Sequence, residues 1–156
     1  MIARYSVDTS ALIDAYYRTY TPNVFVSFWR YLTDLASRGV VVASEEVWQE
    51  LAKKRESELT KWAKSVPGMF QRTDSEVQTT VHDVLSAYPN LVQANSAKSK
   101  ADPFVIALAK VRVCAVLTCE QATGNLQGPK IPDVCRALGI RLVTFSQMLH
   151  EQGITI

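Results

Sequence analysis

The sequence has little of what would set it apart from ordinary globular proteins. Its 156 residues include only three cysteines, six glycines and six prolines. Hydrophobic residues make up 47% and charged residues 21% of the chain, which excludes a disordered or low-complexity protein. The length suits one domain, and a chain of this size buries a sufficient core without disulfides or a structural metal.

Long hydrophobic runs are absent as well. The longest, Arg112–Thr118 and Gly39–Ala43, are far too short to cross a bilayer. The N-terminal residues lack the basic start and apolar stretch of a signal peptide. The cysteines, Cys114, Cys119 and Cys135, are odd in number and form no CxxC pair. We therefore expect reduced thiols, a cytoplasmic location and no membrane partner.

The sequence also has almost no excess of charge of one sign. Seventeen basic residues face fifteen acidic ones, a net charge of +2. A polyanion such as RNA would therefore have to be met by a local patch, because no long-range attraction is available. The two histidines, His82 and His150, stand far apart in the sequence, so we expect no zinc site.

What the sequence does contain is an alternation of short apolar runs with longer helical patterns. This alternation predicts a three-layer α/β/α sandwich around a small, mainly parallel sheet. We expect four strands, within residues 2–7, 40–43, 113–118 and 140–144. Residues 58–90 predict a helical insertion within a single domain spanning residues 1–156. In such folds the working site lies beyond the carboxyl ends of the strands.

Acidic residues occur at the places where this rule directs attention. Asp8 follows the first predicted strand, and Glu120 lies two residues after the third. Asp102 opens the helix before that third strand, and Glu50 lies on the helix after the second. Carboxylates crowded at one sheet edge repel each other unless a cation is present. Oxygen ligands of this kind favour Mg²⁺ or Mn²⁺.

Each acid also has a structural interpretation. Asp8 could cap the following helix, and Asp102, before a proline, is well placed to be an N-cap. Glu45 and Glu46 fall in the first turn of their helix, where the helix dipole favours acids. Glu50 lies beyond that turn, so a stability argument does not explain it.

Four motifs, taken in order, resemble the PIN-domain family over nearly the whole chain. They are Val7–Ser10, Val47–Leu51, Ala101–Ala109 and Leu117–Glu120. The Ala-Asp-Pro and Thr-x-Glu motifs, with Lys130–Cys135 downstream, are similar to a PIN-like subgroup of prokaryotic proteins. The third motif is the most specific of the four.

The resemblance implies metal-dependent endoribonuclease activity that hydrolyses RNA phosphodiester bonds, often as the toxin of a VapC-like toxin–antitoxin pair. The family's acidic quartet corresponds to Asp8, Glu50, Asp102 and Glu120. Asp8, Asp102 and Glu120 would hold one or two Mg²⁺ or Mn²⁺ ions, with Ser10 and Thr118 in support. The chain departs from the family pattern at Glu120, where most PIN nucleases have Asp.

The implied partners are an RNA substrate and a cognate antitoxin protein, and the resemblance leaves a homodimer open. Lys98 and Lys100 precede Asp102 and are the expected contacts to the RNA backbone. Trp62 lies between lysines but is expected in the core. The alternative is a PIN-fold module with weak or no catalysis that acts by binding RNA or protein, which fold alone does not separate from an enzyme.

Overall fold

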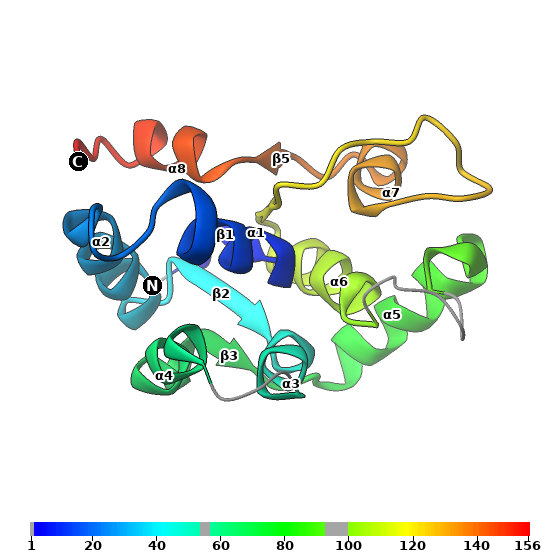
Figure 1. The fold of residues 1–156 in the computed structure, drawn as a ribbon. Coiled ribbons are helices and arrows are strands. Elements are labelled where there is room, and N and C mark those ends of the chain that lie inside the picture. The colour runs from blue at the N-terminus through cyan, green and yellow to red at the C-terminus, as the bar shows by residue number, and fades with distance from the viewer. Residues whose placement is uncertain (1, 54–56, 93–99) are drawn as a thin grey trace.

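The computed structural model describes residues 2–53, 57–92 and 100–156. Its centre is a five-stranded sheet in which every pairing is parallel, in the order β3-β2-β1-β4-β5. The strands are β1 (Tyr5–Val7), β2 (Val41–Ser44), β3 (Phe70–Gln71), β4 (Ala115–Leu117) and β5 (Leu142–Val143). The predicted sandwich of helices around a small parallel sheet is confirmed (Figure 1).

Helices connect the strands and cover the sheet. The α-helices are α1 (Thr9–Asp14), α2 (Val26–Ser37), α3 (Glu45–Lys53), α4 (Glu58–Ser65), α5 (Ser75–Ala87), α6 (Asp102–Arg112), α7 (Ile131–Leu138) and α8 (Phe145–Glu151). The shorter elements are a π-helix, η1 (Ala15–Thr19), and two 3-10 turns, η2 (Pro67–Met69) and η3 (Pro89–Leu91).

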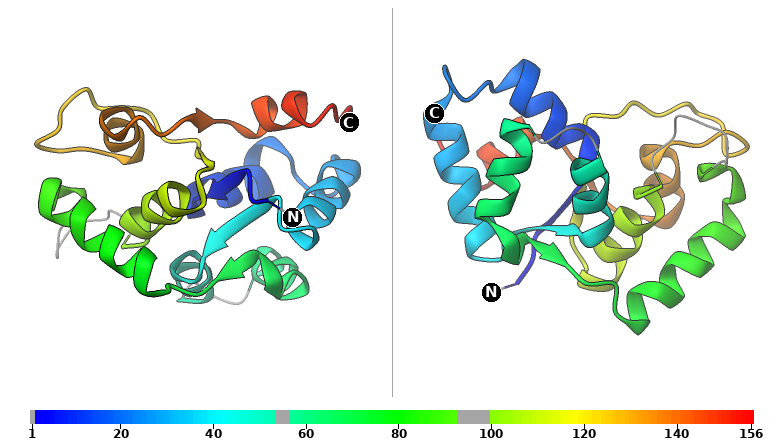
Figure 2. Two further views of the ribbon diagram at one scale, coloured as in Figure 1. Left: turned by 180° about the vertical axis from the view of Figure 1, so that it is seen from behind. Right: turned by 60° about the horizontal axis from the view of Figure 1, so that its bottom comes forward.

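Alternating residues of the central strand face the two helical layers. Ser6 faces α6, where its hydroxyl donates a 2.9 Å hydrogen bond to the carbonyl of Val105. Its neighbours Tyr5 and Val7 belong to the main hydrophobic core. In the right-hand view of Figure 2, α5, α6 and α7 lie on one side of the strands and α2 and α4 lie on the other.

Aromatic side chains fill the core on the α2 side. The ring of Phe28 stacks on Tyr20 with centroids 4.2 Å apart and meets Phe145 of α8 edge-on at 5.2 Å. On the opposite side, Val42 packs in a smaller cluster with apolar residues of α5 and α6. Both faces of the sheet are therefore covered, as a parallel sheet requires.

The expected number of strands is wrong by one. The additional strand, β3, lies inside residues 58–90, which the sequence predicted as a helical insertion without a strand. It pairs with β2, with Phe70 opposite Ala43 and Gln71 opposite Ser44. Two residues are too few to carry an alternating pattern, so this strand exists only through its pairing with β2. The flanking helices α4 and α5 agree with the prediction.

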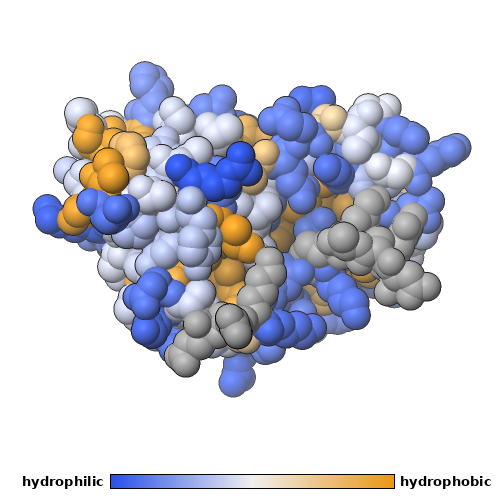
Figure 3. All heavy atoms as spheres, in the orientation of Figure 1, coloured by the Kyte–Doolittle hydropathy of each residue, from blue (hydrophilic) through white to orange (hydrophobic). Residues whose placement is uncertain are grey.

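The face of the molecule drawn in Figure 3 is mostly hydrophilic. Figure 3 shows hydrophobic residues gathered at one end of the visible face, where α2 and the loop before it lie. Val24 in that loop is 68% exposed and Val26, the first residue of α2, is 56% exposed. Within the described ranges, no helix combines the length and apolar character that crossing a membrane requires.

Candidate functional site

Asp8 is the best-defined acid at the carboxyl edge of the sheet. It follows β1 directly and is only 2% exposed. Its Oδ1 accepts a 2.7 Å hydrogen bond from the amide of Ala11, so it is the N-cap of α1, as its structural interpretation predicted. Capping uses only Oδ1 of the carboxylate, and Oδ2 faces Thr118 at the end of the neighbouring strand β4.

Two hydroxyl groups complete the surroundings of Asp8. Thr118, which follows β4, donates a 2.6 Å hydrogen bond to Oδ2. Ser10 donates to both carboxylate oxygens, at 2.9 and 3.0 Å. These are the two residues that the sequence predicted to support the site. They come to Asp8 because β1 and β4 are adjacent and parallel, so their carboxyl ends meet.

Burial governs the electrostatics of Asp8. It raises the pKa of the carboxyl group from its ordinary value of 3.8 to about 6. The hydrogen bonds from Thr118 and Ala11 act in the opposite direction, and the negative charge of Glu120 raises the pKa further. A carboxylate that is buried beside a second acid is stabilised by a cation.

Glu120 lies within electrostatic reach of Asp8, on the loop after β4. Its amide donates to the hydroxyl of Thr118 at 3.1 Å, which links the two acids through one threonine. Its carboxylate Oε2 accepts from the amide of Ile131, the first residue of α7, at 3.3 Å. The sequence therefore located both acids correctly at this edge of the sheet, next to each other.

Glu50 reaches the same region from α3. The hydroxyl of Thr9, the residue after Asp8, donates a 2.6 Å hydrogen bond to Glu50 Oε1. Thr9 was not singled out from the sequence, although its place beside Asp8 could have signalled it. Glu45, by contrast, accepts a hydrogen bond from the amide of Thr73. That contact agrees with a structural role for the first-turn acid.

Asp102 is the first residue of α6 and is 5% exposed. The N-cap of this helix is Ala101, so the expected capping role for Asp102 is wrong. The helix starts one residue earlier than the proline suggested, because Pro103 is accepted at the second helical position as well as at the first. The helix packs on the central strand through Ser6 and Val105, which brings its N-terminal residues towards the sheet.

A bound metal ion requires several ligand atoms close together. Within residues 2–53, 57–92 and 100–156, no three His, Cys, Asp or Glu side chains gather closely enough to hold an ion. Mg²⁺ usually takes one or two carboxylates and keeps several waters, so Asp8 and Glu120, which interact electrostatically, are candidate ligands for a magnesium-type cation. Asp102 as a third ligand remains a prediction.

Asp133 organises the loop beside Glu120, a role that the sequence did not suggest. Burial raises its pKa, but hydrogen bonds from three backbone amides outweigh this effect and lower the pKa of Asp133 to about 2. The donors to its carboxylate, all within 3.0 Å, are the amides of Thr123, Gly124 and Lys130 and the hydroxyl of Thr123. The sequence feature that could have identified Asp133 is its position in the first turn of α7, directly after Pro132.

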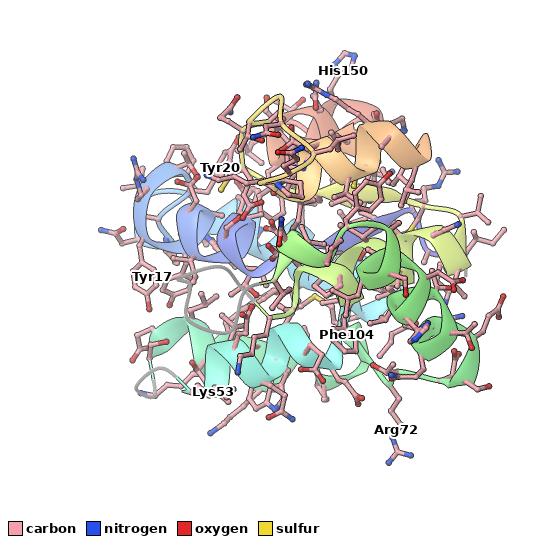
Figure 4. The ribbon with its side chains drawn as sticks, turned by 90° about the vertical axis from the view of Figure 1, so that its right-hand side faces the viewer. Tyr17, Tyr20, Lys53, Arg72, Phe104 and His150 are labelled. Atoms are coloured by element: carbon pink, nitrogen blue, oxygen red, sulfur yellow. The ribbon has the colours of Figure 1, made fainter. Side chains whose placement is uncertain are left out.

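The sequence predicts Lys98 and Lys100 as contacts to RNA and places Trp62 in the core. Lys100 is exposed, two residues before Asp102, as expected for a contact to RNA. Lys98 lies outside the described residues. Trp62 is half-buried, donates a 2.9 Å hydrogen bond to Thr33 and meets Trp29 edge-on, which confirms its place in the core. Figure 4 shows Lys53 at the end of α3.

The three cysteines differ in burial, and their expected lack of a catalytic part stays a prediction. Cys135 is fully buried in α7, and burial raises the pKa of its thiol to about 12. Cys119 is exposed and hydrogen bonds to Ser10 at 3.5 Å, so it contacts the site at its rim. In Figure 4, His150 extends outward on the opposite side of the molecule from Arg72.

Comparisons with known proteins give a family but no activity. No curated protein matches the chain. The model of one family matches residues 5–156, which include every acid described above. The chain therefore belongs to the DUF4411 family, whose description is a domain of unknown function.

Proposed function

We propose that this protein is a metal-dependent endoribonuclease. The observation that carries the proposal is Asp8, a buried carboxylate at the carboxyl end of the central strand. It is fixed by Thr118 and Ser10, and the charge of Glu120 acts on it. Among the described residues, the hydrogen-bond partners of the Asp8 carboxylate include no cationic side chain, so its buried charge is poorly stabilised by them alone. It suits a site that takes up Mg²⁺ or Mn²⁺.

The proposal gives each acid a distinct role. Asp8 and Glu120 would hold the cation, and Asp102 would complete the set from the start of α6. When bound, the cation would lower the pKa of a water molecule and neutralise charge on the scissile phosphate. Glu50 would accept a proton from the attacking water, and Thr9 would hold the Glu50 carboxylate in place through their 2.6 Å hydrogen bond.

The substrate class is inferred from the basic residues that precede α6 in the sequence. Lys100 is exposed beside the start of α6 and, with Lys98, would contact the phosphates of single-stranded RNA. The resemblance to PIN-domain toxins supports a biological role as the toxin of a toxin–antitoxin pair, with a cognate antitoxin as partner. Cytoplasmic RNA would then be the target.

The test is single-turnover cleavage of a labelled RNA by purified protein at saturating Mn²⁺. Wild-type protein should cleave, and Asp8→Asn should not. Asp34→Asn is the matched control, because Asp34 is an exposed acid of α2 that pairs only with Arg38 among the contacts described. Mn²⁺ should also raise the melting temperature of the wild type and the control, but not that of Asp8→Asn.

A second candidate function is a binding module without catalysis. The Ile131 amide donates a hydrogen bond to the Glu120 carboxylate. This contact competes with binding of a cation by Glu120 and so favours a module without catalysis. Such a module would bind RNA or protein equally well in wild-type and Asp8→Asn forms and would leave the RNA intact. Cleavage that is the same in both forms would instead point to a contaminating nuclease and would contradict the proposed site.

A further inference from the structure

A pocket of about 570 Å³ opens at the edge of the sheet opposite to Asp8. The residues around it precede β1, β4 and β5, so it lies at the amino ends of three adjacent strands. The last turns of α6 and α7 close its sides. Its size falls in the range of small-molecule sites, roughly 300–1,000 Å³. It shares no lining residue with the acidic site.

The lining of this pocket carries charge of one sign. It includes Arg4, Lys110 and Arg141, and none of its described lining residues is acidic. Arg141 pairs with Glu151 of α8. Arg4 and Lys110 make no ion pair with the carboxylates of the described residues, although the net charge of the whole chain is only +2.

A contribution to fold stability explains the position of Lys110 better than that of Arg4. Lys110 lies in the last turn of α6, where the helix dipole favours a positive charge. Arg4 belongs to no helix and stands directly before β1. Its hydrogen bonds to the described residues are made by its backbone: the amide donates to the carbonyl of Val40 and the carbonyl accepts from the amide of Ala115. Arg4 is therefore stronger evidence for an anionic ligand than Lys110 is.

The rim of the same pocket exposes hydrophobic side chains. Ile2 is 81% exposed and Val113 is 88% exposed, the two highest values among the large hydrophobic residues described. Val113 also has a φ of 55°, in the left-handed region that helix ends normally assign to glycine. A branched side chain in this conformation is strained. The chain thus keeps an exposed, strained valine where glycine would fit better.

We propose that this pocket binds a small amphipathic organic anion, with a phosphate or carboxylate head at Arg4 and Lys110 and an apolar body against Ile2 and Val113. Charge-assisted hydrogen bonds would fix the head group, and covering the exposed valine and isoleucine would supply the hydrophobic contribution. Inorganic phosphate would lack the second contribution, and an uncharged alcohol would lack the first.

Titration by isothermal calorimetry and by amide chemical shifts tests this proposal with hexyl phosphate, hexanoate, inorganic phosphate and hexanol. Hexyl phosphate, hexanoate or both should bind at least about tenfold more tightly than inorganic phosphate or hexanol. The shifted amides should lie around Arg4, Lys110 and Val113. The preference between the first two probes identifies the head group.

Variants separate a built pocket from a diffuse basic surface. The double variant Arg4→Gln/Lys110→Gln should weaken binding about tenfold or more, because charge-assisted hydrogen bonds are lost. Val113→Gly, which relieves the strained backbone, should remain folded and bind hexyl phosphate more weakly. Arg136→Gln is the control, since Arg136 is an exposed cation of α7 that does not line the pocket.

Three outcomes would overturn the proposal. They are equal binding of hexyl phosphate and inorganic phosphate, equal losses in the double variant and in Arg136→Gln, and amide shifts centred on Asp8 and Thr118. Asp8→Asn should bind the probes like the wild type, because the two sites lie at opposite edges of the sheet. Failure of the nuclease proposal is therefore distinguishable from failure of this one.

Discussion

The hydroxyl of Thr118 donates a 2.6 Å hydrogen bond to Oδ2 of Asp8, across 110 positions of sequence. This contact ties the ends of β1 and β4 together inside the protein, where it is screened from water. It also favours the charged form of Asp8, whose pKa burial raises to about 6. Thr118 therefore acts on the proposed site through the carboxylate of Asp8.

Replacing Thr118 by Val should raise the pKa of Asp8 above about 6, because a donor to the charged form is lost while burial remains. Native stability at neutral pH should fall by roughly 1–3 kcal/mol, the usual consequence of leaving a buried group with one partner fewer. Carboxyl ¹³C titration by NMR measures the pKa. Thr118→Ser keeps the hydroxyl and should restore both values, and an unchanged pKa in Thr118→Val would contradict the role of this bond.

The pH dependence of stability should reveal Asp8 in metal-free buffer. Its folded-state pKa of about 6 lies above the ordinary 3.8, so the native state binds this proton more tightly than the unfolded chain does. The stability that Asp8 contributes is therefore present below about pH 4 and is lost as the pH rises through 6. Near pH 7 the loss amounts to about 3 kcal/mol.

Denaturant unfolding of wild type and Asp8→Asn between pH 4 and 8, with a chelator present, measures this loss. The variant should gain stability relative to the wild type as the pH rises, and the difference should level off above about pH 7. Added Mn²⁺ should reduce the difference, because the cation stabilises the charged native carboxylate. A difference independent of pH would rule out a raised pKa for Asp8.

Glu50→Gln should retain the fold and lose cleavage by about 10²–10⁴-fold, the range that a general base contributes. Glu46→Gln is the matched control on the same helix and should be much milder, because Glu46 lies in the first turn of α3. Single-turnover cleavage at saturating Mn²⁺ compares the two. An inactive Glu46→Gln with an active Glu50→Gln would place the functional acid one turn earlier.

Thr9→Val removes the 2.6 Å hydrogen bond to Glu50 and should lower cleavage by less than Glu50→Gln does, since the carboxylate itself remains. The double variant should be no slower than Glu50→Gln alone, because the two residues act as one unit. Additive losses would show that Thr9 acts independently of Glu50. Thr9→Ser, which keeps the donor, should retain most of the activity.

Asp133 should respond to pH in the opposite direction from Asp8. Its pKa is lowered to about 2, so its stabilising contribution is present above the ordinary 3.8 and is lost as the pH falls through about 2. Asp133→Asn should destabilise the protein by roughly 1–2 kcal/mol at pH 7, after allowance for solvent screening. Thermal unfolding from pH 2 to 7 tests this, and a constant difference over that range would contradict it.

The sequence by itself determined the fold class and the positions of the acids along the chain. Parallel strands must be joined by a crossover connection, which is usually a helix. The alternation of apolar strands with helices of sufficient length can therefore be recognised in the sequence alone. Asp8 follows its strand directly and Glu120 lies three residues after the end of β4, so the rule for carboxyl ends located them. Ser10 and Thr118 also lie within two residues of these positions.

Only the tertiary structure decided which groups meet. The strand Phe70–Gln71 has no pattern of its own and forms because β2 offers hydrogen-bond partners. The bond between Thr9 and Glu50 joins residues 41 positions apart and depends on how α3 packs beside α1. The raised pKa of Asp8 and the lowered pKa of Asp133 likewise come from opposite balances of burial and hydrogen bonding. Such balances depend on three-dimensional surroundings, which residue type and spacing do not specify.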